Sequence, residues 1–289
     1  MNKYKEKINI FLKGFAMGMV DIIPGISGGT MALILGIYEK IILELKKINF
    51  KNLKRIFKKD KNQEKIDFKF LIILFLGIIT AIISLAKIIH YLLEKHNSYL
   101  YGFFFGLIIA SIFIILPKKF YKNKKFIFII PGFLIAWIIS SAESLTTANS
   151  YFNIFLSGAI AICAMILPGI SGSFILLILG KYEFMISVLK NPFMDNNLIY
   201  IFIFVLGCLV GLLSFVKLLS YAFKKHHTIS LAILIGFMAG ALKKIWPFSQ
   251  TLINEKDFLI NITPIILLMI LGIITGIFIP RMVKTKNRG

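Results

Sequence analysis

Two short polar stretches interrupt long apolar runs in this chain, and their residue types are suited to binding an anion. The first reads "PGISGGT" from Pro24 and the second reads "PGISGS" from Pro168. A Pro-Gly pair ends a helix, because proline lacks an N–H and glycine adopts conformations that other residues avoid. The following serine suits the N-cap of a new helix, whose unpaired N–H groups and positive dipole end attract phosphate. The sequence therefore predicts helix breaks at Pro24, Gly25, Pro168 and Gly169, and phosphate-binding residues at Ser27, Gly28, Gly29, Thr30, Ser171, Gly172 and Ser173.

Five ionisable residues lie in or beside the apolar runs, where a charge is costly and is by default a functional candidate. Lys87 and Lys217 each lie inside an apolar segment. We predict that they face a phosphate pathway, although a single lysine there can also extend its stem to the interface. Asp21, Glu39 and Glu183 are predicted to serve in coupling or gating. The alternatives are that Asp21 caps a local turn and that both glutamates end in water.

The run "GALKKIWPF" from Gly240 places two lysines beside a tryptophan. We predict that Lys243 and Trp246 contact a lipid headgroup. The alternative for Trp246 is a place in the aromatic belt at the membrane interface.

The sequence contains no set of residues suited to catalysis or to metal binding. Cys163 and Cys208 lie inside apolar segments and form neither a CxxC nor a Cys/His motif. No Ser/His/Asp set or carboxylate-histidine cluster falls at an intramembrane position. We therefore expect no metal, no cofactor and no enzymatic activity.

Composition places these residues in a membrane protein. Hydrophobic residues make up 58% of the 289 residues, and they run in blocks instead of alternating. The net charge of +21 lies in short basic runs between the blocks, which is typical of topology signals and argues against nucleic-acid binding. Six segments are long enough to span a bilayer, namely 70–93, 98–116, 126–142, 198–222, 229–246 and 263–281.

Each polar stretch separates two apolar halves, which are 8–20 with 28–45 and 151–167 with 172–189. A helix of about 13 residues rises only about 20 Å, short of the roughly 30 Å hydrocarbon core. We therefore expect an all-α polytopic membrane protein with six transmembrane helices and two re-entrant helical hairpins, at 8–45 and 151–189.

The loop charges predict that both termini are cytoplasmic. With the N-terminus inside, the loops 46–69, 117–125 and 223–228 and the C-terminal tail are also inside, and they carry most of the lysines and arginines outside the spans. This is the positive-inside distribution of a multi-pass protein of the cytoplasmic membrane. Lys243 and Lys244 are exceptions, because this topology places them at the outer end of a span.

The chain contains a tandem repeat. Between Pro24–Glu39 and Pro168–Glu183, eleven of sixteen positions are identical at an offset of 144, and similarity resumes later at an offset of 130. Each half, 1–145 and 146–289, holds one hairpin and three spans, so the odd number of crossings inverts the second half. Inverted repeats are typical of secondary transporters, whose substrate site lies at the repeat interface. The alternative is that the polar stretches are tight packing turns between helices.

At these residues the chain resembles the polyprenyl-phosphate transporter (PopT) family of bacterial and archaeal membrane proteins. The resemblance rests on "DIIPGISGGTMALILGIYE", "LPGISGSFILLILGKYE" and "GALKKIWPF" and covers nearly the whole chain. It implies a flippase that returns undecaprenyl phosphate, the lipid carrier for wall polymers, from the outer to the cytoplasmic leaflet. It also implies that Pro24 to Thr30 and Pro168 to Ser173 form substrate-facing re-entrant tips.

The two copies of the motif differ, because Ser173 and Phe174 stand where the first copy has Gly29 and Thr30. The two tips therefore need not contribute equally. An ion or small-anion channel or transporter is the alternative function, and a structural or assembly role is a further one. The sequence leaves open a homo-oligomer, and it leaves open coupling to protons, to sodium or to neither.

Overall fold

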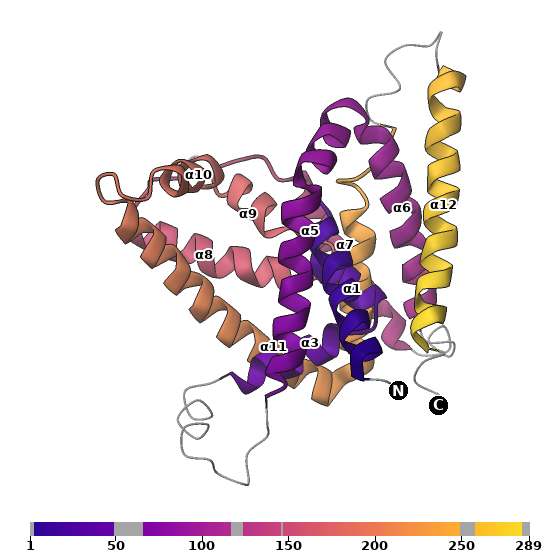
Figure 1. Ribbon diagram of the computed structural model, residues 1–289, viewed down its shortest axis with the longest axis horizontal. Helices are drawn as coiled ribbons and strands as arrows, with labels where there is room; N and C mark the ends of the chain where they lie inside the picture. Colours follow the sequence, from indigo (N-terminus) through magenta and orange to yellow (C-terminus); the bar gives the residue numbers. More distant parts are fainter. Residues whose placement is uncertain (1–2, 49–65, 117–123, 146, 249–257, 285–289) are drawn as a thin grey trace.

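The computed structural model describes residues 3–48, 66–116, 124–145, 147–248 and 258–284, and all regular structure in these ranges is helical (Figure 1). The prediction of an all-α membrane protein is thereby confirmed. Five helices are long and apolar enough to cross a membrane, or six if one bent pair of short helices counts as a span. The predicted basic loops at 46–69 and 117–125 fall largely outside the described residues.

The helices follow the repeat order. The first copy contains α1 (Lys3–Asp21), α2 (Gly28–Ile34), α3 (Tyr38–Lys47), α5 (Phe68–Lys95), α6 (Asn97–Ile115), the 3-10 helix η2 (Lys124–Phe128) and α7 (Ile129–Ser141). The second copy contains α8 (Tyr151–Ile166), α9 (Gly172–Ile178), α10 (Tyr182–Lys190), α11 (Asn197–Ala241) and α12 (Phe258–Lys284).

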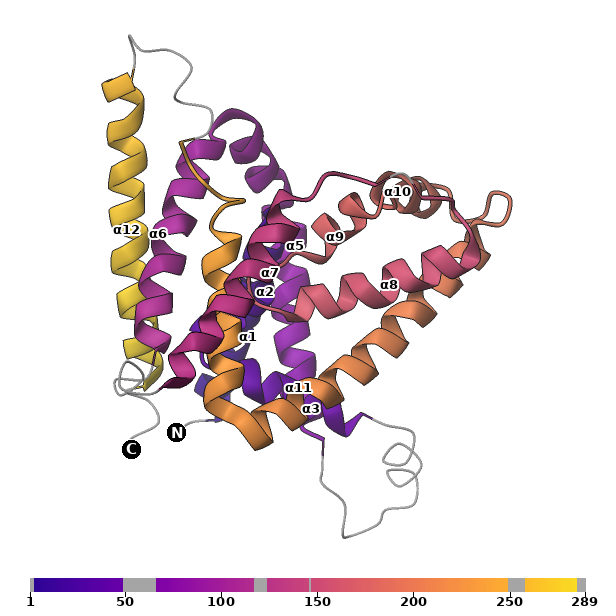
Figure 2. The ribbon, with the colours of Figure 1, turned by 180° about the vertical axis from the view of Figure 1, so that it is seen from behind.

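The predicted spans 198–222 and 229–246 fall on two helical segments that share the label α11. The segments meet at His226, inside the expected connection 223–228, where φ is −137° and ψ is 51°. The segment before this kink descends and the segment after it rises, so the chain reverses direction there (Figure 2). His96, at the matched position of the first copy, has a similar backbone, with φ −140° and ψ 35°, and separates α5 from α6.

The second half of each predicted hairpin is also divided in two. A glycine with positive φ ends α2 and α9, with 66° at Gly36 and 64° at Gly180. This left-handed conformation is readily adopted by glycine and commonly ends a helix. The helices α9 and α10 are bent by 110° relative to each other. Glu39 and Glu183 therefore begin separate short helices and do not continue the helices that start at the tips.

Long helices pack in pairs that correspond between the two copies. The helix α1 packs along α5, and α8 packs along the N-terminal part of α11. The last helix of each copy crosses over, because α7 packs along the C-terminal part of α11 and α12 packs along α6. Matched glycines allow this close approach, since a Cβ atom would lie within 2.4 Å of a partner carbonyl oxygen at Gly14 (Leu74), Gly158 (Phe204), Gly106 (Met269) and Gly236 (Ile129).

The short helices α3 and α10 lie toward opposite ends of the molecule (Figure 1). The helix α3 lies at the end where both termini lie, whereas α10 lies toward the other end (Figure 1). Seen from behind, α2 lies in the centre, where α8 ends (Figure 2), and the two helices are in contact. The breaks after α1 and α8 are therefore brought together in the middle of the fold.

Polar contacts fix α3 to the start of α5. Lys40 Nζ lies 3.0 Å from Asp67 Oδ2, and the Asp67 N–H donates to Glu44 Oε2 at 2.8 Å. Partial burial raises the pKa of the Asp67 carboxyl, but hydrogen bonds from the Phe70 N–H and the Lys40 ammonium outweigh it. The pKa of Asp67 is therefore lowered overall.

Candidate functional site

Two short turns form the centre of the candidate site. We call Pro24–Thr30 the first tip and Pro168–Ser173 the second tip. Each tip contains a glycine with positive φ, at 90° for Gly25 and 87° for Gly169. The serines at the following N-caps, Ser27 and Ser171, are both extended, as expected for residues that precede a helix. The backbone of the first tip is thus repeated in the second.

The two tips are joined by hydrogen bonds. Thr30 Oγ1 accepts the Gly169 N–H at 2.7 Å, and Ser27 Oγ donates to the Met165 carbonyl at 3.1 Å. Both side chains of the first tip are buried, each with 1% of its surface exposed. Residues about 140 positions apart in the sequence thus lie against each other. Of the two hydroxyls that sequence analysis assigned to phosphate, that of Ser27 donates to the end of α8 and that of Thr30 accepts from the second tip.

The backbone donors of the first tip are already paired inside the protein. The Gly28 N–H donates to Asp21 Oδ1 at 2.6 Å, and the Gly29 N–H donates to Ser27 Oγ at 3.1 Å. A Cβ atom on Gly28 would lie 2.5 Å from Asp21 Oδ2, so glycine makes room here for the carboxylate. The position predicted for a phosphate at this helix terminus is occupied by an anion from the chain itself.

The second tip is more open than the first. Met165 stands where the first copy has Asp21, and Ser171 Oγ makes no capping bond but pairs with Ser173 Oγ at 2.8 Å. The N–H groups of Gly172 and Ser173 have no acceptor in the part of the chain that the structure describes. Ser173 is exposed. The unequal contribution of the tips that the sequence differences imply therefore has a geometric counterpart.

The lysines predicted to line a pathway lie on long helices away from polar partners. Lys87 on α5 and Lys217 on α11 are both exposed. Neither makes a hydrogen bond or an ion pair with any described residue. The structure therefore does not join them to the tips through a polar contact.

The predicted gating glutamates differ in their surroundings. Glu39 Oε1 lies 2.9 Å from His227 Nε2, which links α3 to α11 directly after the kink at His226. Glu183, the matched residue on α10, is exposed and has no polar partner among the described residues. His227 was not among the residues singled out from the sequence, although it follows the matched histidine.

The predicted headgroup residues lie where α11 ends. The Lys243 ammonium donates to Ser141 Oγ and lies 4.6 Å from the centre of the Trp137 ring. Trp246 is 47% exposed and packs edge-on against Phe105, with the ring centres 5.4 Å apart. Both residues therefore join the end of α11 to other helices.

Sequence analysis did not single out Lys181, which is fully buried. Its ammonium donates to Thr147 O at 2.5 Å, Ala148 O at 2.9 Å and Asn149 Oδ1 at 2.8 Å. Lys181 replaces Ile37 of the first copy, and this difference between "LGKYE" and "LGIYE" is the signal that marks it. The lysine fixes the segment before α8 to the end of α9.

Comparisons with known proteins agree with one another. The family model described as undecaprenyl phosphate translocase-like matches residues 17–261. The polyprenyl-phosphate transporter of Vibrio cholerae serotype O1 is 41% identical over 254 residues, which cover 86% of this chain and 81% of the relative. The polyprenyl-phosphate transporter of Staphylococcus aureus is 33% identical over 255 residues, which cover 83% of this chain and 86% of the relative. No solved structure matches the chain.

Proposed function

Because the chain belongs to the undecaprenyl phosphate translocase-like family, we propose that it transports polyprenyl phosphate across the bilayer. Two relatives of nearly the same extent are named polyprenyl-phosphate transporters. The apolar helices supply a membrane-embedded body for such a substrate, whose hydrocarbon chain stays in the lipid. The proposed direction is from the outer to the cytoplasmic leaflet of the cytoplasmic membrane, which returns the carrier for cell-envelope synthesis.

The proposed architecture is an inverted repeat, 1–145 and 146–289, with two re-entrant hairpins and cytoplasmic termini. Support comes from the matched backbone angles of the tips and from the exchange of α7 and α12 between the copies. Further support comes from the positions of α3 and α10 toward opposite ends of the molecule (Figure 1). Inverted repeats of this kind place the substrate at their interface, and that interface contains the tips.

One observation carries the proposed mechanism, namely that the tips are held together by donors that a phosphate can take over. The Gly169 N–H now donates to the Thr30 hydroxyl of the first tip, and the Ser27 hydroxyl donates to the Met165 carbonyl at the end of α8, both of which are neutral oxygens. A phosphate offers charged oxygens to the same donors, and charge-assisted hydrogen bonds are stronger than neutral ones. Phosphate binding would therefore separate the tips, and the two copies would rock to change the face to which the headgroup is exposed.

Other residues take the roles predicted from the sequence. Lys87 and Lys217 neutralise the headgroup along its path, and Glu39 with Glu183 serve in gating. The pairing of Glu39 with His227 supports this role on one face, because it connects a hairpin to the kinked helix α11. Lys243 and Trp246 are proposed to contact the headgroup at the membrane surface.

Transport is tested with proteoliposomes that contain undecaprenyl phosphate in both leaflets. A phosphatase added outside hydrolyses only the accessible lipid, and the released inorganic phosphate is measured. With the protein present, we expect hydrolysis to continue until the inner pool is consumed, whereas protein-free vesicles stop after the outer pool. Equal plateaus in both samples would contradict the proposed function.

The same purified protein also separates transport from the alternative functions. A channel would give ionic conductance across a planar bilayer without any polyprenyl lipid. A lipid phosphatase would release inorganic phosphate before the external enzyme is added. Transport predicts neither result.

A further inference from the structure

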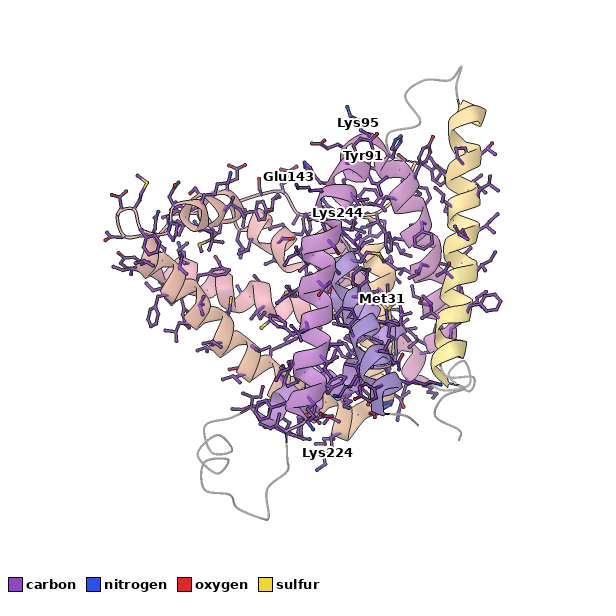
Figure 3. All side chains as sticks on the ribbon, viewed as in Figure 1. Met31, Tyr91, Lys95, Glu143, Lys224 and Lys244 are labelled. Atoms are coloured by element: carbon purple, nitrogen blue, oxygen red, sulfur yellow. The ribbon has the colours of Figure 1, made fainter. Side chains whose placement is uncertain are left out.

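Lys244 lies beside both tips. Its stem packs over the first tip, because a Cβ atom on Gly25 would lie 2.7 Å from Lys244 Cγ. Its ammonium nitrogen lies 4.1 Å from the centre of the Phe174 ring, on the helix that the second tip begins. Figure 3 labels Lys244 toward the end of the molecule that carries Lys95 and Glu143, away from Lys224. This one side chain therefore touches both copies of the motif.

Lys244 is exposed. Among the residues that the structure describes, its ammonium has no hydrogen-bond acceptor, and it lies over the Phe174 ring. An exposed cation over an aromatic ring is held weakly compared with a cation bonded to a phosphate. Ser173, the residue before Phe174, is also exposed and offers a hydroxyl.

The neighbouring lysine is engaged elsewhere. The Lys243 ammonium is bonded to Ser141 Oγ and lies over the Trp137 ring on α7. At the repeat offset of 130, the first copy has Phe113 and Ile114 in place of Lys243 and Lys244. The cation beside the tips thus occurs once, so it breaks the symmetry of the repeat.

We propose that Lys244 is the cation that binds the phosphate monoester of the transported lipid where it reaches the tips. This inference rests on the proposed transport function and deepens it, because it names the residue beside the tips that recognises the charge of the lipid headgroup. The ammonium leaves the Phe174 ring and bonds to the phosphate oxygens, and the Ser173 hydroxyl adds a donor. Lys243, which is bonded to Ser141 on α7, keeps its separate proposed contact with the headgroup at the membrane surface.

Native mass spectrometry of the purified full-length protein tests this assignment. Undecaprenyl phosphate and undecaprenol are titrated separately, and the ratio of their affinities measures recognition of the phosphate. Lys244→Met keeps the aliphatic stem over Gly25 and removes the charge, so we expect the ratio to fall about tenfold or more. Lys244→Arg should keep most of the preference. Lys95→Met is the control, because Lys95 is an exposed lysine toward the same end of the molecule, and it should leave the ratio unchanged. Lys244→Gln is a second neutral variant if Lys244→Met does not fold.

The outcomes separate the inference from the function on which it rests. A wild-type preference for undecaprenyl phosphate that survives in the neutral Lys244 variants would overturn the assignment and leave the transport proposal standing. Wild-type protein without any such preference would overturn both. A large excess of inorganic phosphate should not displace the lipid, and its doing so would show that the site binds free phosphate instead of the lipid headgroup.

Discussion

Replacing Asp21 with asparagine tests whether the first tip binds phosphate. Asp21 Oδ1 accepts the Gly28 N–H at 2.6 Å, so a phosphate can use that donor only after the carboxylate leaves. A hydrogen bond to a charged group contributes about 1.5–3 kcal/mol, and one between neutral groups about 0.5–1.5 kcal/mol. Asparagine keeps the acceptor oxygen and loses the charge, so the side-chain bond that competes with phosphate for the Gly28 N–H becomes weaker by about 1–1.5 kcal/mol. We expect Asp21→Asn to bind undecaprenyl phosphate about tenfold more tightly.

The assay is a titration of purified wild-type and Asp21→Asn protein by native mass spectrometry. Undecaprenol serves as the control ligand, because it carries the hydrocarbon chain without the phosphate and its affinity should not change. Asp21→Met is the matched variant that the chain itself provides, since the second copy carries Met165 at this position. It removes both the charge and the oxygen, so a folded Asp21→Met protein should bind the phosphate at least as tightly as Asp21→Asn.

Two results would refute this reasoning. Unchanged affinity in both variants would mean that the Gly28 N–H is not a phosphate donor, and that Gly28 is needed only to admit the carboxylate. Weaker binding in Asp21→Asn would mean that the carboxylate assists the substrate, for example by holding a coupling cation, and does not compete with it.

Three other contacts give predictions that concern stability. Lys181→Met removes charge-assisted hydrogen bonds, so it should lower the free energy of unfolding by roughly 2–4 kcal/mol and speed proteolysis of the segment before α8. The exposed Lys190→Met is the control, and unchanged cleavage in Lys181→Met would contradict the prediction. Thr30→Val leaves the buried Gly169 N–H without its acceptor, so it should lower the free energy of unfolding in detergent by about 1–3 kcal/mol. Thr30→Ser keeps the hydroxyl and should lower it less. Equal losses in the two variants would argue against the bond. Because the pKa of Asp67 is lowered in the folded protein, its contribution to stability is complete above its ordinary value of 3.8 and is lost as pH falls through the folded pKa. Asp67→Asn should therefore flatten the acid limb of the unfolding profile, and an identical profile would contradict the assignment.

Much of the fold could be predicted because each helix in a membrane satisfies its own backbone hydrogen bonds. Apolar length therefore located α5, α6, α7 and α12 within a few residues. The prediction failed where helix continuity depends on single residues. The turns at Gly36 and Gly180 divide two segments, each of which sequence analysis predicted to be one apolar half.

The sequence by itself determined that this is a helical membrane protein with a repeated Pro-Gly break, because composition and local conformational preference are properties of neighbouring residues. The tertiary structure alone decided that Thr30 accepts a hydrogen bond from the Gly169 N–H, that Asp21 accepts one from the Gly28 N–H, and that Lys244 lies against both tips. Each of these contacts depends on how helices pack, through side-chain shape and close backbone approach between residues distant in the chain. The motif predicts an anion site, and only the packing distinguishes a tip closed by the protein from a tip open to a ligand.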